Sequence, residues 1–297
     1  MPTRAGTAPA ALPAPVWRAR QAAHEARVDA WLAGHRARRA EGRRHPVEDF
    51  LFTYYSHRPA QLRRWHPGAG VVLGGADPAA WGGDYAAVPG GAALDAAGVL
   101  ARRGASAAWI RDLLAATAAR PAHLGCFGMH EWAMVYRQAQ GEVRHEAWPL
   151  RLGPEGTAAV VDAATIRCSH FDAYRFFTEA ARPRNALTPT RQAQRALEQP
   201  GCLHANMDLY KWSYKLSPLV PGELVADCFA LAREIRVLDM RASPYDLRAL
   251  GYAPVPVETP AGRAAYAAAQ RDFAARAAGL RDRLIAAVDA AAAAAQP

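Results

Sequence analysis

The chain has 297 residues, 51% of them hydrophobic and 21% charged, a composition typical of an ordinary globular protein. It contains no run of about 18 apolar residues and no clear secretory signal, so we expect a cytoplasmic protein without a membrane partner. The net charge is +9, and residues 1–44 hold nine arginines against three acidic residues, which suits this segment to contact with phosphate groups.

The amino-terminal half predicts helices with short extended segments between them. Residues 1–15 are rich in Ala and Pro and are expected to form a disordered tail. Apolar residues at helical spacing predict an amphipathic helix over 16–44, and Pro46 suits the start of a short helix over 46–56. Next in chain order we expect a strand at 71–73, a glycine-rich loop over 74–92, helices near 105–119 and 129–138, and strand character at 143–152 and 165–170.

The carboxyl-terminal half is predicted to be helical. Thr188 and Pro189 suit the cap and first position of a helix over 189–199. Further helices are expected over 203–216 and 221–240, with a last one from Thr259 into an Ala-rich end. The predicted class is therefore mainly α (α+β): one helical domain over 16–290 with a few short strands, and a tail at 291–297.

Three segments place a histidine beside a carboxylate: GCFGMHEWAMVYR with His130 and Glu131, CSHFDAYRFF with His170 and Asp172, and CLHANMDLYKWSYKL with His204 and Asp208. An extended 168–172 would put His170 and Asp172 on one face, and a helical 203–216 would put His204 and Asp208 one turn apart. Both pairs would then present imidazole and carboxylate together.

These residues permit four interpretations. A carboxylate that orients a histidine produces a general base. Imidazoles with a carboxylate can instead hold iron, manganese or zinc, with ligands drawn from His130, His170, His204 and one of Asp172, Asp208 or Glu131. A zinc site of Cys168, His170, Cys202 and His204 would use a tighter spacing than usual. In the fourth interpretation the histidines only bond buried carboxylates. Without CxxC pairs, the four cysteines are expected to be reduced.

No GxxxxGK[ST] or G-x-S-x-G motif is present, which argues against a P-loop nucleotide site and an α/β-hydrolase. The segment PLVPGELVADCFALAREIRVLDMRASPYDL, residues 218–247, has a Pro-Gly turn before a helix that ends near acidic residues. This arrangement faintly resembles the helix-hairpin-helix DNA glycosylases. In that comparison Gly222 begins the hairpin, Leu224 replaces its second glycine, and Asp246, or less favourably Asp239, is the acid.

Several long blocks together resemble a bacterial family whose members are commonly labelled 3-methyladenine DNA glycosylase. The blocks are HPVEDFLFTYYSHRPAQLRRWHPG, GCFGMHEWAMVYR, CSHFDAYRFF, EQPGCLHANMDLYKWSYKLSP and DMRASPYDL, and the resemblance runs over residues 45–285. It implies an enzyme that flips alkylated purines such as 3-methyladenine out of double-stranded DNA and hydrolyses the N-glycosidic bond without a metal or other cofactor.

If the label holds, the catalytic candidates are the carboxylates and histidines of these blocks: Asp246, Asp208, Asp172, His170 and His204. The candidates for binding DNA are aromatic, imidazole and charged side chains: Tyr54, Tyr55, His57, Trp65, His130, Glu131, Trp132, Arg175, Lys211, Trp212 and Arg241. The carboxyl end of HPVEDFLFTYYSHRP is expected to line the pocket, and its middle to pack in the core.

Two other classes of protein stay open at this stage. One is a metal-dependent enzyme that acts on a small polar or anionic substrate through His130, His170, His204 and Asp172. The other is a non-catalytic nucleic-acid-binding protein that uses the basic amino-terminal helix.

Overall fold

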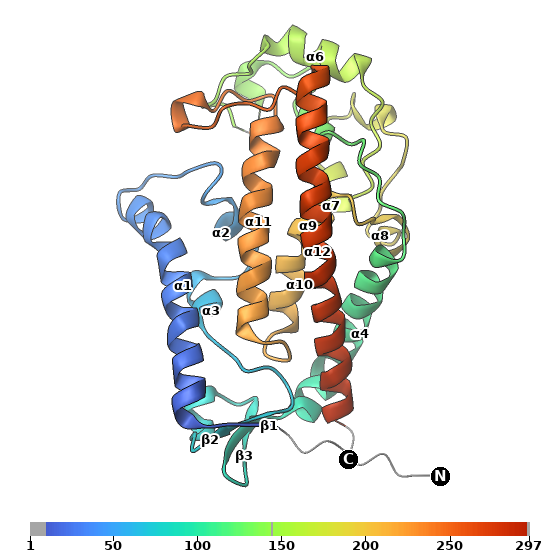
Figure 1. The fold of residues 1–297 in the computed structure, drawn as a ribbon. Coiled ribbons are helices and arrows are strands. Elements are labelled where there is room, and N and C mark those ends of the chain that lie inside the picture. Colours follow the sequence, from blue (N-terminus) through green and yellow to red (C-terminus); the bar gives the residue numbers. More distant parts are fainter. Residues whose placement is uncertain (1–9, 144, 296–297) are drawn as a thin grey trace.

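Two long helices from the carboxyl-terminal part of the chain form the centre of the structure, α11 (Gly222–Ala242) and α12 (Pro260–Ala294). They run side by side along the molecule, as Figure 1 shows for the computed structural model, which describes residues 10–143 and 145–295. α11 is buried on most of its surface because apolar residues occupy nearly all of its faces, as expected for a helix surrounded by others.

Further helices pack around this pair. α4 (Ala96–Ala118) packs along α12, and α9 (Leu203–Met207) and α10 (Leu209–Leu216) pack on α11. The helix predicted over 203–216 is therefore divided at Asp208, which ends one helix and begins the next. α4 begins nine residues before the predicted start, after the cap residue Asp95, whose side chain accepts a hydrogen bond from Gly98 N at 2.9 Å.

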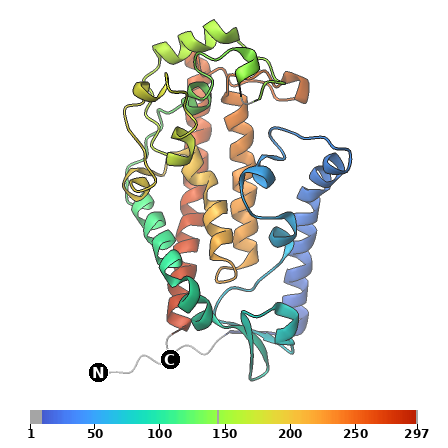
Figure 2. The ribbon, with the colours of Figure 1, turned by 180° about the vertical axis from the view of Figure 1, so that it is seen from behind.

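α1 (Ala14–Ala40) lies at the side of the molecule and packs through its buried residues Trp17, His24, Val28 and Leu32. Two short helices, α2 (Phe50–Tyr54) and α3 (Pro59–Arg63), connect it to the centre, and Figure 2 shows them beside α1 from the other side. α2 is shorter than the predicted 46–56 segment.

A four-stranded sheet closes the end of the molecule that is lowest in Figure 1. Its strands are β1 (Ala10–Leu12), β2 (Val71–Gly74), β3 (Tyr85–Val88) and β4 (Gly91–Leu94), in the order β1-β2-β4-β3, with only β1 and β2 parallel. Two predictions were wrong here: residues 10–15 of the expected tail form β1 and the first residues of α1, and the expected loop over 74–92 contains β3. Residues 1–9 and 296–297 of the expected tails lie outside the described residues.

The region between α4 and α9 consists of short helices and turns. The strand character predicted at 143–152 and 165–170 is wrong for the described residues of these segments, which form only single bridges, Leu150 with Tyr245 and Ile166 with Asn185. The helix predicted over 189–199 shrinks to Gln194–Leu197. The elements here are α5 (Met129–Ala133), α6 (Gly153–Ala163), α7 (Phe171–Tyr174) and α8 (Gln194–Leu197). In the part of the chain that the structure describes, the 3-10 helices are η1 (Pro78–Trp81), η2 (Gln140–Glu142), η3 (Arg182–Arg184) and η4 (Arg248–Leu250).

The expected class, a mainly helical single domain with a few short strands, is confirmed. Among the described residues, none of the helices combines the length and the apolar composition that crossing a bilayer requires. The four cysteines are free, as expected.

Candidate functional site

Buried histidines and carboxylates meet where the carboxyl-terminal part of α11 faces α5, α7 and α9. They form two groups, each of which brings three side-chain ligand atoms within 4.8 Å of one another. We call His130, His204 and Asp239 the first cluster, and His170, Glu198 and Asp208 the second cluster. The three histidine segments of the sequence therefore do converge, although not on a single set of ligands.

The first cluster is supported by charged neighbours from α5 and α11. His130 Nε2 lies 2.9 Å from Asp239 Oδ1, and Arg236 donates hydrogen bonds to Asp239 Oδ2 at 3.0 Å and to Glu131 Oε1 at 3.2 Å. Burial opposes protonation of His130, but the Asp239 carboxylate raises the pKa of this histidine above its usual value. Burial and the nearby Asp239 raise the pKa of Glu131. α5 starts from Gly128 in the left-handed region (φ 69°), a turn that favours glycine.

His204 is the member of the first cluster that lies next to the second cluster. Its ring meets the ring of His130 edge-on at 4.3 Å and stacks on the ring of His170 at 5.4 Å. Among the described residues, no hydrogen bond involves a ring nitrogen of His204, whereas His170 Nε2 contacts Asp208 and His170 Nδ1 is buried without a partner. Burial, together with the neighbouring His130, holds the pKa of His204 well below its usual value, so the ring is neutral and carries a free lone pair.

In the second cluster, the carboxylate of Asp208 is fully engaged. Its Oδ1 accepts a hydrogen bond from the Tyr55 hydroxyl at 2.8 Å, and its Oδ2 lies 3.2 Å from His170 Nε2 and accepts from Lys211. Glu198 adds a contact of 3.5 Å to His170 Nε2. Burial alone would raise the pKa of Asp208, but Lys211 and His170 hold it well below its usual range.

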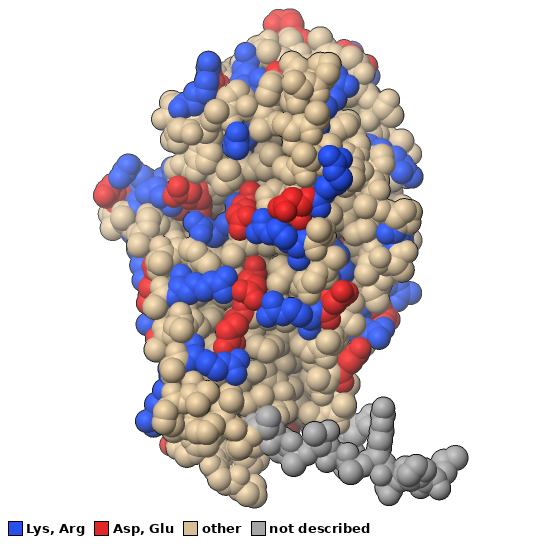
Figure 3. Space-filling model, viewed as in Figure 1, with Lys and Arg blue, Asp and Glu red and all other residues tan. Residues whose placement is uncertain are grey.

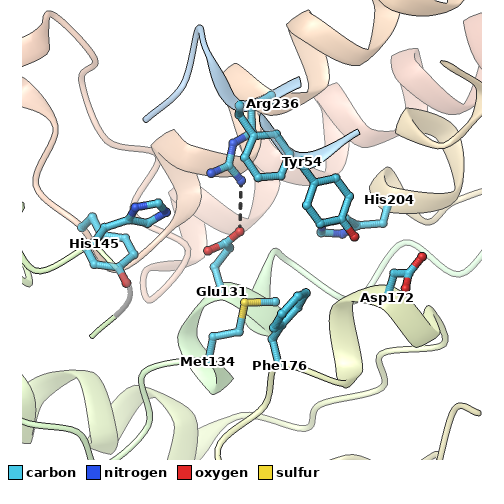
Figure 4. A pocket seen from close by; sticks show the side chains of 10 residues that line it. Tyr54, Glu131, Met134, His145, Asp172, Phe176, His204 and Arg236 are labelled. Carbon is cyan, nitrogen blue, oxygen red and sulfur yellow. Dashed lines mark hydrogen bonds and ion pairs between the residues drawn. The ribbon is translucent and has the colours of Figure 1, made fainter. Parts of the chain in front are cut away.

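A small cavity adjoins the first cluster, whose His204 is part of its lining (Figure 4). Its volume is about 30 Å³, which has room for an ion or for one or two water molecules and not for a purine base. Arg236 stacks on Phe50 at 3.7 Å, and Phe50 in turn stacks on Tyr54 at 5.0 Å. The residues lining the cavity are Phe50, Tyr54, Glu131, Met134, His145, Asp172, Phe176, His204, Arg236 and Tyr245.

The expected ligand sets are corrected in two ways. Asp172 belongs to neither cluster and instead pairs with Lys211 at 3.0 Å and with Arg175 at 3.2 Å. Cys168 and Cys202, which were one alternative as zinc ligands with His170 and His204, take part in no ligand group of the described residues.

Several predicted DNA-binding and catalytic residues lie away from the cavity. Trp65 and Trp132 are 1% and 0% exposed and belong to the core, so neither can stack on a base in this structure. Trp212 is also buried, against Lys211 and Lys215, and Arg241 donates to the carbonyl oxygen of Ala253 at 2.8 Å. Asp246 pairs with the exposed Arg248 at 2.5 Å, which lowers its pKa to about 2.

The candidate hairpin glycine is also engaged inside the protein. Gly222 N donates to the carbonyl oxygen of His66 at 2.8 Å, and a Cβ at Gly222 would meet the Trp65 ring at 3.0 Å. The amide at the start of α11 is therefore not free to bind a backbone phosphate.

Three important residues were missed or given another role. Glu198 and Arg236 were not predicted, and Asp239 was considered only as a glycosylase acid. A signal for two of them exists, because Arg236 and Asp239 stand three residues apart in IRVLDM and share a helix face. Glu198 contacts His170, which lies 28 residues earlier in the sequence, and only the folded chain brings the two together.

The fold and the two clusters thus define a mainly helical protein with buried histidine–carboxylate groups beside a small cavity. No protein-family model, curated protein or solved structure matches the chain. What the protein does is therefore argued from the chemistry of its own residues.

Proposed function

We propose that the protein is a metal-dependent enzyme in which His130, His204 and Asp239 hold a divalent ion. The proposal rests on His204, an imidazole that lines the cavity and has no hydrogen-bond partner among the described residues. Its ligand nitrogen lies within 4.8 Å of the ligand atoms of His130 and Asp239. Two histidines and one carboxylate are a known ligand set for divalent iron, and they leave coordination positions open for substrate.

The ion is assigned to the first cluster because the Asp208 carboxylate of the second one is already fully engaged, although His170 Nδ1 there has no hydrogen-bond partner among the described residues. His170 and Asp208 contact each other, and Asp208 also accepts hydrogen bonds from Tyr55 and Lys211. A metal there would have to displace the ammonium group of Lys211 from Asp208, whereas in the first cluster His204 is unengaged and the contacts of Asp239 with His130 and Arg236 would have to rearrange.

The residues around the cavity favour a small polar or anionic substrate. Arg236 offers a guanidinium group and Tyr54 a hydroxyl group at its wall, and the volume of about 30 Å³ restricts the reacting part of the substrate to a small group. A bound ion would act as a Lewis acid toward that group. Arg236 also fixes Asp239 and Glu131 in place, so it has a positioning role.

Metal analysis of purified protein tests this proposal. We expect close to one equivalent of iron, manganese or zinc per chain in the wild type and a loss of at least tenfold in His204→Ala. His123→Ala, which changes a histidine outside both clusters, should keep the metal, and circular dichroism should show that both variants are folded. Metal-free wild type that also fails to take up these ions on reconstitution would contradict the proposal.

Removal of alkylated purines from DNA stays a prediction, supported by one feature of the cavity. The stacked rings of Phe50 and Tyr54 stand beside Asp172, which suits a planar base next to a carboxylate, although the cavity would have to widen. Release of 3-methyladenine from alkylated duplex DNA by chelator-treated protein, abolished in Asp172→Asn, would favour this function over the metal-dependent one.

A further inference from the structure

A large basic groove lies between the carboxyl-terminal half of α1 and the segment that contains α2 and α3, which Figure 2 shows side by side. Its volume is about 1310 Å³, far larger than the cavity beside the clusters. Six arginines line it: Arg36, Arg39, Arg43, Arg44, Arg58 and Arg63. Asp49 is the acidic residue of its lining, and this residue is buried and bonded to Arg38 and His35.

The positive charge of this groove is only partly compensated. Arg36 and Arg63 share Asp29, and Arg43 pairs with Glu41. Within the described part of the chain, the guanidinium groups of Arg39, Arg44 and Arg58 have no ion-pair partner, and all three residues are exposed. The groove therefore presents three free guanidinium groups that can each bind a phosphate oxygen pair.

One face of the molecule, drawn in Figure 3, carries blue and red side chains close to one another. Arginines of α1 and α12 pair with acidic residues of α11, as in the contacts Arg27–Asp227 and Arg276–Glu234. Exposed arginines without an ion pair also occur elsewhere in the described residues, such as Arg271, but three of them line this one groove.

The groove also has aromatic rings on its surface. His57 lies flat on Tyr214, with ring centroids 4.5 Å apart and an angle of 9° between the planes, and Phe52 lines the groove nearby. Planar rings of this kind can support a planar ligand group.

We propose that this groove binds a phosphorylated small molecule of nucleotide size, with its phosphates on Arg39, Arg44 and Arg58 and its planar part against His57 and Phe52. Arginines stand on both walls, on α1 with the turn after it and at the start of α3, which suits a compact ligand held between walls. The inference concerns a separate surface and does not rest on the proposed metal site.

Nucleotide binding by the full chain tests the phosphate part of the proposal. With ATP in EDTA and low salt, isothermal titration calorimetry should show saturable binding to wild type. A combined Arg39→Ala, Arg44→Ala, Arg58→Ala variant should bind at least tenfold more weakly. Arg271→Ala, which removes an exposed arginine of α12 outside the groove, should bind like wild type. Equal affinity of the triple variant and wild type would overturn the proposal.

Two further probes test the ring contact and the size of the ligand. His57→Ala should lower the affinity for ATP and leave the affinity for pyrophosphate unchanged. An equal effect on both ligands would refute the contact between the planar part of the ligand and His57. Single-stranded oligonucleotides whose affinity rises steadily with length, beyond that of ATP, would overturn the small-molecule assignment in favour of nucleic acid.

Discussion

Asp208 shows, at the scale of single residues, how much of this interior depends on complete pairing. It is 2% exposed, yet its two oxygens contact Tyr55, His170 and Lys211, which come from three different segments. Lys211 in turn depends on Asp208 and Asp172 for compensation of its charge. A buried group of this kind stabilises the fold only while all its partners are present.

Asp208→Asn is therefore expected to destabilise the protein by about 3 kcal/mol, because it leaves the Lys211 charge undercompensated in a buried place. Urea unfolding measures the change. Asp246→Asn, which changes a carboxylate paired with an exposed arginine, should have little effect. A similar loss in both variants would show that Asp208 has no special role in the core.

His57 should make stability depend on pH. Burial lowers its pKa from 6.5 to about 4, so between these pH values the unfolded chain binds a proton that the folded chain excludes. The effect of His57 on the free energy of unfolding is therefore most favourable above pH 6.5. As the pH falls toward 4, the free energy of unfolding decreases by about 2 kcal/mol, after allowance for the partial exposure of the ring. His57→Phe keeps the stacking on Tyr214 and removes this titration. The difference in melting temperature between variant and wild type should grow on acidification, and a constant difference would exclude the effect.

The sequence singled out His130, His170, His204 and Asp208, because histidine next to carboxylate is visible in the residue order. It could not assign Asp208 to His170, or Asp239 to His130, since these pairs are separated by 38 and 109 residues. Such contacts depend on how helices pack, and a local pattern does not contain that information. Burial also depends on how the helices pack, so it cannot be predicted from a local pattern. Trp65 and Trp132 were therefore expected at a binding site, although both lie in the core.

At the scale of elements, the helices with apolar residues at regular spacing were predicted, whereas among the described strands only β2, expected at 71–73, was predicted. Helix hydrogen bonds are local, so residues such as those of α11 define their own element. A strand needs a partner, and the predicted 143–152 and 165–170 segments lack one, whereas the short β3 finds β4 directly across a turn.

The sheet provides a test of close backbone packing. A Cβ on Gly91 would lie 2.0 Å from the carbonyl oxygen of Leu73 on β2, so Gly91→Ala must move one strand. We expect a loss of about 2 kcal/mol or more in thermal or urea unfolding. Gly279→Ala in α12, where nothing lies within 4 Å, should be neutral or slightly stabilising. Equal changes in the stability of the two variants would contradict the close backbone contact between Gly91 and Leu73.

At the scale of the whole molecule, the proposed ion would join α5, α9 and α11 and so stabilise the folded state. A ligand that binds only the native protein adds about 2.7 kcal/mol at a concentration 100 times its dissociation constant. The melting temperature of wild type should therefore rise with added manganese or zinc and fall with chelator, and that of His204→Ala should not respond. An equal response of the variant would place the ion elsewhere.

α2 separates the cavity from the basic groove and contributes to both. Phe50 and Tyr54, one turn apart, face the cavity, and Phe52 and Thr53 face the groove. A five-residue helix with an opening on each side cannot shift toward one without changing the shape of the other. Occupation of the two sites should therefore be thermodynamically linked, and any factor by which metal changes nucleotide affinity must equal the factor by which nucleotide changes metal affinity.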